Sequence, residues 1–353
     1  MSATQDQVAG RGLPPFTVVI TVRNEVSNIA KVVDGLLAQS YAPAEIIIVD
    51  GVSTDGTLEI LNRFETQGHI RLISRPCNIA QGRNIGVAHA SQSHIAVTDA
   101  GCEIDPDWLR ELGNCFAANP GVEVVSGNYK FDIQTPFEEA VVLATDHPDR
   151  ETSDQARYYP SSRSIAFRKA AWEAVKGYPE WLYAAEDTLF NIRLRELGFG
   201  FVFCQSAIVR WRPRTSVRAM VRQFFNYARG NGRVGIGISG YLTNLQNHGL
   251  SLILLAIGLW KWPFALAGLG VLALHIRRYL WPQACIASTR STYSGMRWRV
   301  VGIMELVRLV GMTGFLAGRY DRWRDPRFVQ AQIDWMGVAS LDDAPPLNEH
   351  PDN

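Results

Sequence analysis

The sequence has few cysteines, and their spacing matches no common disulfide or metal-binding motif. Its 353 residues contain five, with no C-x-x-C pair and no other spacing typical of metal ligands. They are Cys77, Cys102, Cys115, Cys204 and Cys285. An odd number at scattered positions argues against the disulfide framework of a small secreted protein and against a zinc ribbon. We therefore expect the chain to work in a reducing compartment.

Two further absences concern the beginning of the chain. Residues 1–15 are polar, contain Gly and Pro, and have no apolar run, so we expect no signal peptide and a disordered segment there. No G-x-G-x-x-G follows the first apolar run. This absence counts against a dinucleotide-dependent oxidoreductase, which remains an alternative because the pattern of strands and helices described below permits it.

The net charge of +1 hides an uneven distribution. Residues 1–208 contain 17 Lys and Arg against 26 Asp and Glu, whereas residues 209–353 contain 18 against 8. All but Lys261 of those 18 are arginines, and the planar guanidinium suits phosphate and anionic lipid headgroups. We expect the second part to face such groups, with an ordinary solvated basic surface as the alternative.

Apolar, β-branched runs predict buried strands in the first part of the chain. Four such runs occur, at residues 16–22, 46–49, 70–74 and 94–98. Apolar side chains repeat at helical spacing between them, which predicts an α/β sheet with helices on both faces. Glu25, Asp50 and Asp99 follow three of the runs, at the sheet edge where open parallel sheets bind ligands. For Asp50 and Asp55 the alternative is that they only accept hydrogen bonds within the turn.

The middle of the chain continues this pattern less regularly. We expect further strands at residues 122–126 and 199–209 and a helix at residues 137–145. Residues 146–160 are polar and charged and are expected to form a mobile loop. Residues 217–233 have apolar side chains on one side and arginines on the other, which predicts a helix at a membrane interface or a plain docking helix.

Two apolar segments follow. Residues 250–276 carry Lys261 as their only charge, so they form either one tilted membrane span or a hairpin of two short helices with the sequence W-K-W-P at its turn. Residues 300–317 contain Glu305 and Arg308, three apart on one helical face. Such a pair is either neutralised inside a helical bundle or marks a helix that lies in the interface.

Several motifs in residues 16–233 resemble those of the family 2 glycosyltransferases. V-V-I-T-V-R-N-E resembles the first strand of the family, V-D-G-V-S-T-D-G-T its V-D-D-G-S-T-D-G-T element, and G-R-N-I-G its A-R-N-x-G element. The resemblance implies the GT-A (nucleotide-diphospho-sugar transferase) fold, a Rossmann-like, mostly parallel α/β sheet with helices on both faces. We expect C-terminal membrane-associated helices to follow it.

The resemblance also implies the residues that bind the donor. Acidic groups of the first two motifs contact the nucleoside, and the arginine of the third lies near the diphosphate or the sugar. Carried over to this chain, the donor-binding residues are Thr21, Arg23, Glu25, Asp50, Asp55, Arg83, Asp99 and Arg229. Gly177-Tyr178-Pro179 resembles the G-G-F turn of the family and is expected to lie against the donor sugar.

The sequence A-E-D at residues 185–187 resembles the E-D-x-x-L element, in which the aspartate is the catalytic base. An inverting transfer needs one carboxylate to take the proton of the acceptor hydroxyl as its oxygen attacks the anomeric carbon. We therefore assign Asp187 as the base, with Glu186 beside it. The alternative is that Asp187 is an ordinary first-turn residue favoured by the helix dipole.

One motif departs from the family. The fourth strand is followed by Asp99-Ala100-Gly101, so glycine stands where the D-x-D element has its second, metal-ligating aspartate. Mg²⁺ or Mn²⁺ needs oxygen ligands, and Glu103, two residues after Gly101, is the candidate substitute. The histidine that many members carry near Trp211 is also absent. We therefore expect arginines to replace the cation wholly or partly, and the candidates are Arg210, Arg212, Arg214 and Arg229.

The sequence thus predicts a disordered N-terminus (1–15), a GT-A domain (16–235), a membrane-associated helical region (236–330) and a disordered acidic tail (331–353). The expected activity is inverting transfer of one sugar from a UDP- or GDP-sugar to a lipid-linked or saccharide acceptor. We expect the catalytic domain on the cytoplasmic side of the inner membrane, no organic cofactor and no nucleic acid partner. The Q-x-x-R-W signature of processive relatives is absent, and a non-catalytic membrane-anchored nucleotide-sugar-binding or scaffold protein is the alternative.

Overall fold

A computed structural model describes residues 12–146 and 160–337. The expected disordered N-terminus up to residue 11, the expected loop at residues 147–159 and the tail from residue 338 lie outside the described residues. The chain divides into two compact units. Unit 1 contains residues 1–132 and 149–212, and unit 2 contains residues 133–148 and 213–353.

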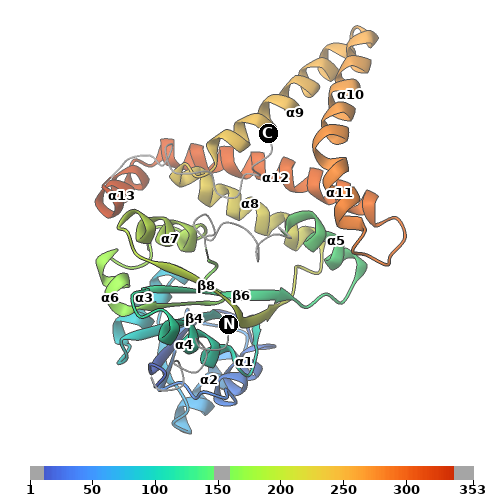
Figure 1. Cartoon of the computed structure of the whole chain (residues 1–353). Helices are drawn as coiled ribbons and strands as arrows, with labels where there is room; N and C mark the ends of the chain where they lie inside the picture. Colours follow the sequence, from blue (N-terminus) through green and yellow to red (C-terminus); the bar gives the residue numbers. More distant parts are fainter. Residues whose placement is uncertain (1–11, 147–159, 338–353) are drawn as a thin grey trace. The chain divides into compact units, whose positions relative to one another are not determined.

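Unit 1 is built on one sheet of eight strands in the order β3-β2-β1-β4-β7-β6-β8-β5 (Figure 1). The strands are β1 (Phe16–Val22), β2 (Glu45–Asp50), β3 (Arg71–Ser74), β4 (His94–Asp99), β5 (Cys102–Ile104), β6 (Val124–Phe131), β7 (Ile165–Arg168) and β8 (Phe201–Trp211). The first four pair in parallel, whereas β7 runs antiparallel to both β4 and β6. The predicted α/β fold is confirmed, and β5 and β7 are the strands that the sequence pattern did not predict.

Helices cover both faces of this sheet. They are α1 (Ile29–Leu37), α2 (Thr57–Thr66), α3 (Ile79–His89), α4 (Trp108–Ala118), α6 (Lys169–Ala174) and α7 (Glu186–Glu196). One core joins alternate residues of β1 and β2, such as Ile20 and Ile48, to α1 and α4. The other joins the intervening residues, such as Val19 and Ile47, to α3, α6 and α7. The continuous apolar runs in the sequence follow from this burial on both faces.

Helix α3 lies unusually close to β1. A Cβ atom at Gly82 would lie 2.3 Å from Thr21 Cγ2, and one at Gly86 would lie 2.3 Å from Val19 Cγ1. Asn78 begins the helix with a capping box, in which its side chain accepts from the Gln81 amide. These two glycines therefore let α3 approach the sheet, which carries Arg83 to the carboxyl edge of the strands.

Unit 2 is helical. Its elements are α5 (Pro136–Thr145), α8 (Val217–Val234), α9 (Ile238–Gly258), α10 (Trp262–His275), the π-helical turn η2 (Ile276–Leu280), α11 (Trp281–Ser288), α12 (Met296–Arg324) and α13 (Arg327–Met336). Helix α8, the expected basic amphipathic helix, packs against α12. Cβ atoms at Gly314 and Gly318 would lie 2.5 Å from Phe225 O and 2.1 Å from Arg229 O, so these glycines permit the close contact.

The apolar segment at residues 250–276 is a helical hairpin, the second of the two predicted arrangements. Helices α9 and α10 meet at Leu259, Trp260 and Lys261, and the side chains of Leu259 and Trp260 are 92% and 86% exposed. In the described residues, one helix, α12, is long and apolar enough to cross a membrane, and 44% of its most apolar window is buried. This length and composition are weak evidence for a membrane span.

The borders of the units differ from those expected in two places. Helix α8 clusters with α12, so unit 2 resumes at Pro213, whereas the sequence analysis placed α8 in the catalytic domain up to residue 235. The tail expected to be disordered from residue 331 is helical up to Met336. Gln332, Trp335 and Met336 of α13 are buried, so the apolar spacing of this helix, and not the acidic composition after it, decides its structure.

Candidate active site

The side chain of Asp50 organises the turn after β2. Its carboxylate accepts from the Ser53 amide and hydroxyl and from the Ser74 hydroxyl, and it is fully buried. Asp55 acts in the same way, because it accepts from the Thr57 hydroxyl at 2.6 Å and from the Val26 amide at 3.1 Å. The turn-forming alternative therefore holds for both residues, and their contact with a nucleoside stays a prediction.

The other residues predicted near the nucleoside lie around the same edge of the sheet. The Thr21 hydroxyl is buried at the end of β1 and has no hydrogen-bond partner in the described part of the chain. The Glu25 amide donates to the Thr57 hydroxyl, and its carboxylate accepts from the Asn28 amide group. Arg23 is exposed. The contact of Thr21, Arg23 and Glu25 with a donor therefore stays a prediction.

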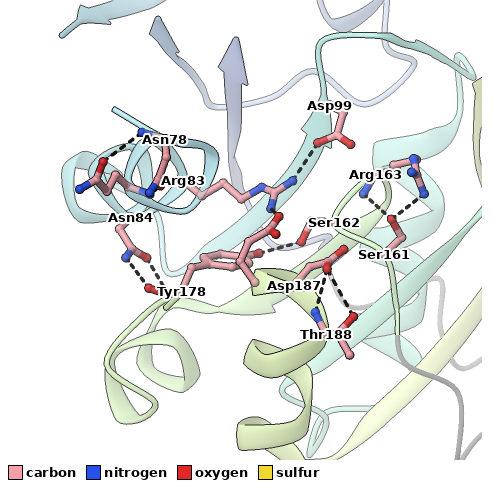
Figure 2. Close-up of polar contacts among 12 residues, drawn as sticks. Asn78, Arg83, Asn84, Asp99, Ser161, Ser162, Arg163, Tyr178, Asp187 and Thr188 are labelled. Carbon is pink, nitrogen blue, oxygen red and sulfur yellow. Dashed lines mark hydrogen bonds and ion pairs between the residues drawn. The ribbon is translucent and has the colours of Figure 1, made fainter. Parts of the chain in front are cut away.

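The guanidinium of Arg83 joins a strand end to a helix start. Nη2 lies 2.9 Å from Asp99 Oδ1 at the end of β4, and Nη1 lies 2.7 Å from Glu186 Oε1 at the start of α7 (Figure 2). Its side chain is only 3% exposed. Burial alone would lower the pKa of Arg83, but Asp99 and Glu186 raise it above the usual value. Arg83 was predicted near the diphosphate, and the structure shows it holding the two acidic elements together.

Glu186 and Asp187 differ in their surroundings although they are adjacent. Burial raises the pKa of Glu186 to about 7, Asp187 adds to this effect, and Arg83 opposes it. Asp187 is half-buried, and its Oδ1 accepts from the Thr188 amide at 2.8 Å. Nothing in the described residues donates to its other oxygen. Asp187 thus has a free carboxylate oxygen at the helix start, as a general base requires.

The turn at Gly177 and Tyr178 is held against α3 by Asn84. Its Nδ2 donates to the Tyr178 carbonyl, and its Oδ1 accepts from the Tyr178 amide and from Trp172 Nε1. Gly177 has a φ of +74°, and a Cβ atom there would lie 2.5 Å from Asn84 Oδ1, so a larger residue does not fit. Tyr178 stacks on Phe190 of α7 at 4.1 Å. This turn therefore links the Arg83 helix to the Asp187 helix.

The acidic groups after β4 do not form a two-carboxylate metal site. Asp99 is paired with Arg83 through Oδ1, and Gly101 provides no side chain. In β5, Cys102 and Ile104 are buried whereas Glu103 is exposed, as the alternation of a strand requires. In the described residues, no hydrogen bond joins Glu103 to Asp99 or to a group that binds Asp99. After β4, Asp99 is therefore the carboxylate that is positioned to bind a divalent cation.

Arg163 places a positive charge at this edge that the sequence did not predict. The Arg163 guanidinium lies 4.2 Å from the ring centre of Trp211 and 5.7 Å from that of Tyr129, and Nη1 donates to the Ser161 hydroxyl at 3.0 Å. Figure 2 shows Arg163 and Asp99 in the same part of the site. The charges of Asp99 and Arg163 both affect the pKa of the Cys102 thiol. Burial raises the pKa of that thiol to about 12, Asp99 adds to this, and Arg163 opposes it.

In the sequence, Arg163 stands between two serines in a segment of small residues, and this pattern is the feature that could have indicated it. The arginines that were predicted instead have other surroundings. Arg210 faces Asp105 at 3.6 Å and is 41% exposed. Arg214 donates to Gln223 within unit 2, and Arg229 forms two hydrogen bonds to Asp321 there. A role of Arg229 toward the donor therefore stays a prediction.

The fold and these residues define a class. Unit 1 has an α/β sheet whose carboxyl edge carries acidic groups, a buried arginine and a helix-start aspartate. Residues 17–174 match the family described as Glycosyl transferase family 2. This segment of the chain is a family 2 glycosyltransferase domain, and the chain is a glycosyltransferase.

Several characterised proteins are similar to this chain. Glycosyltransferase AglE of Haloferax volcanii is 26% identical over 233 residues, which are 63% of this chain and 74% of AglE. The succinoglycan biosynthesis protein ExoA of Rhizobium meliloti is 26% identical over 227 residues, 61% of this chain and 68% of ExoA. The O-antigen chain rhamnosyltransferase RfbN of Salmonella typhimurium is 23% identical over 227 residues, 60% of this chain and 70% of RfbN.

A solved structure supports the fold assignment. The mannosyltransferase PcManGT of Pyrobaculum calidifontis, in complex with GDP-Man and Mn²⁺, superposes with a TM-score of 0.52 at 18% sequence identity. The match covers 88% of this chain and 92% of that chain. At this identity the likeness concerns the fold, which is the predicted GT-A-like architecture.

Proposed function

We propose that the chain is an inverting glycosyltransferase that moves one sugar from a UDP- or GDP-sugar to a hydroxyl of a lipid-linked or saccharide acceptor. The observation that carries the proposal is the ion-pair bridge from Asp99 through Arg83 to Glu186. This bridge fixes the start of α7, and thus Asp187, relative to the sheet edge where nucleotides bind in such folds. Relatives that act in succinoglycan and O-antigen synthesis support a role in cell-surface polysaccharide.

In the proposed reaction Asp187 accepts the proton of the acceptor hydroxyl. The acceptor oxygen forms a bond to the anomeric carbon, and the bond from that carbon to the diphosphate oxygen breaks on the opposite side. The nucleoside diphosphate leaves with the electron pair of the broken bond. The free carboxylate oxygen of Asp187 is the group for this proton, because Glu186 is buried and already paired with Arg83.

The leaving diphosphate carries negative charge that the site has to offset. A metal held by two carboxylates does not fit the residues after β4, so no step is assigned to it. Arginine pairs with phosphate through parallel hydrogen bonds. We assign this role first to Arg163, which the aromatic rings of Trp211 and Tyr129 keep at the edge of the site. Asp99, 33% exposed, remains the group through which a cation bound to the donor would act.

The acceptor is proposed to come from a membrane. Nucleotide sugars are made in the cytosol, so the catalytic unit is placed at the cytoplasmic face of the inner membrane. Support comes from unit 2, where Leu259, Trp260 and Trp262 at the hairpin turn are exposed and Lys261 lies between the tryptophans. Tryptophan and lysine are common at membrane interfaces.

Thermal stabilisation by nucleotides tests the donor class. The detergent-solubilised chain is heated with UDP, GDP, dTDP or CDP, each with EDTA and with Mn²⁺, because a ligand at a hundred times its Kd stabilises by about 2.7 kcal/mol. We expect one nucleotide to raise the melting temperature in EDTA as well as in Mn²⁺. A rise that requires Mn²⁺ contradicts the role of arginine, and no rise with any nucleotide favours a scaffold protein.

A further inference from the structure

Three potential metal ligands meet inside unit 2. His248 comes from α9, His275 from α10 and Glu305 from α12. One ligand atom of each lies within 4.8 Å of the others. Both histidines are 5% exposed, and the Glu305 side chain is 19% exposed. The hairpin and α12, whose ribbons are drawn in Figure 1, thus supply a small group of nitrogen and oxygen ligands.

The hydrogen bonds of His248 fix which ring nitrogen is protonated. Nδ1 lies 2.8 Å from the Asn244 carbonyl oxygen, which can only accept, so Nδ1 carries a proton. Nε2 of the neutral ring is then an acceptor, yet it lies 2.6 Å from Glu305 Oε1, which is another acceptor. Two acceptors at this distance share a proton, and a metal ion that takes the place of the proton requires the two atoms to move apart.

Two further atoms of the group lack partners. Glu305 Oε2 and His275 Nδ1 are buried without a hydrogen bond in the described residues. A buried polar atom without a partner is costly. Mutual neutralisation of Glu305 and Arg308 was one of the two predicted arrangements, but each faces a histidine instead, with Arg308 Nη1 3.2 Å from His275 Nε2. The carboxylate of Glu305 is therefore paired with His248.

We propose that His248, His275 and Glu305 bind one divalent transition-metal ion of the Zn²⁺ class. Two imidazoles and a carboxylate suit such an ion, whereas Mg²⁺ and Ca²⁺ prefer oxygen ligands. Ligand atoms on a tetrahedral Zn²⁺ are about 3.4 Å apart, as follows from bonds of about 2.0–2.1 Å. Side-chain rotations have to bring the ligand atoms to this spacing, because the His248–Glu305 pair is now 2.6 Å apart and no pair is farther apart than 4.8 Å. The bond from His248 Nδ1 to a carbonyl is the usual support of a metal-bound imidazole.

The positive charge of Arg308, next to His275, disfavours the binding of a metal ion. A metal on His275 Nδ1 moves the ring proton to Nε2, toward Arg308, so the guanidinium has to turn away. A metal on Nε2 displaces it directly. In either case removal of the guanidinium strengthens metal binding, whereas removal of a ligand weakens it, and this opposite sign separates a metal site from a plain hydrogen-bond network.

The test uses the full chain in detergent without a polyhistidine tag, stripped with EDTA and reloaded with Zn²⁺ or Co²⁺. Metal content, melting temperature and the Co²⁺ absorption spectrum are measured, and none of them depends on sugar transfer. Wild type is expected to bind one equivalent. Glu305→Gln and His275→Ala are expected to lose at least about a hundredfold in affinity, Arg308→Met is expected to gain, and exposed His69→Ala is the control.

Wild type that binds no metal overturns the proposal and assigns the charge between His248 and Glu305 to a proton. Metal that binds equally to wild type and to the ligand variants overturns it as well, because the ion then lies elsewhere. If His275→Ala does not fold, the conservative Glu305→Gln alone decides between these outcomes.

Discussion

The guanidinium of Arg83 lies 2.7 Å from the carboxylate of Glu186, although the two residues are 103 positions apart in the sequence. Both side chains are less than 10% exposed. Through this ion pair, α3, which lies close to the sheet, controls the start of the helix that carries Asp187. Loss of Arg83 therefore affects the site and the stability of unit 1 together.

Arg83→Met is expected to destabilise the chain by about 3–5 kcal/mol, because it leaves Glu186 buried without its partner and next to Asp187. The double variant Arg83→Met, Glu186→Gln is expected to recover a large part of this loss, since it removes the buried charge. Chemical denaturation monitored by circular dichroism measures both. Equal stability of the single variant and wild type contradicts the buried pair.

A histidine at the start of β4 makes the stability depend on pH. Burial lowers the pKa of His94 to about 4, and Arg168 adds to this effect. Between pH 6.5 and 4 the unfolded chain therefore binds more protons here than the folded one, and folding stability falls as the pH falls, by up to about 1.4 kcal/mol per pH unit.

His94→Phe preserves the aromatic contacts with Phe16 and Phe116 and removes this titration. Its melting temperature is expected to vary less than that of wild type between pH 6.5 and 4. Exposed His69→Ala is the matched control and is expected to retain the wild-type slope. The idea is refuted if the wild type and His94→Phe curves are parallel.

Gly101→Asp places a second carboxylate after β4. A Cβ atom at Gly101 would have no neighbour within 4 Å, so the variant is expected to fold. We expect turnover of wild type to resist EDTA and turnover of Gly101→Asp to rise with Mn²⁺, because hard cations bind carboxylate pairs. Gly121→Asp, also in open space, is the control. Loss of wild-type turnover in EDTA, with rescue by a divalent ion, contradicts the account.

Arg163→Met is expected to raise the Kd of the preferred nucleoside diphosphate by about 10-fold to 100-fold, the value of one or two charged hydrogen bonds. Arg163→Lys retains the positive charge but not the planar guanidinium, and its Kd is expected to lie between those of wild type and Arg163→Met. Exposed Arg63→Met controls for the loss of one positive charge. Calorimetric titration measures all four proteins, and an unchanged Kd for Arg163→Met refutes the assignment.

The sequence predicted what depends on local pattern. The run at Phe16–Val22 is strand β1 with the predicted bounds, and Asp187 lies in the first turn of a helix as expected. The sequence did not predict that β7 inserts between β4 and β6. The four residues of β7 form a strand because they pair with two strands that are distant in the sequence, and their own pattern of apolar residues does not indicate one. The same holds for Arg163, whose position comes from the rings of Trp211 and Tyr129, and for the meeting of His248 with Glu305, 57 positions apart.

The role of Asp187 as the base is tested by sugar transfer with the purified chain, labelled UDP- and GDP-sugars and membrane lipid extract as the acceptor. Asp187→Asn is compared with wild type, and nucleotide-dependent melting confirms that the variant folds and binds. The account predicts glycosylated product of inverted configuration with wild type and a rate at least about a hundredfold lower with the variant. Transfer by the variant at the wild-type rate, or retention of configuration, would contradict it.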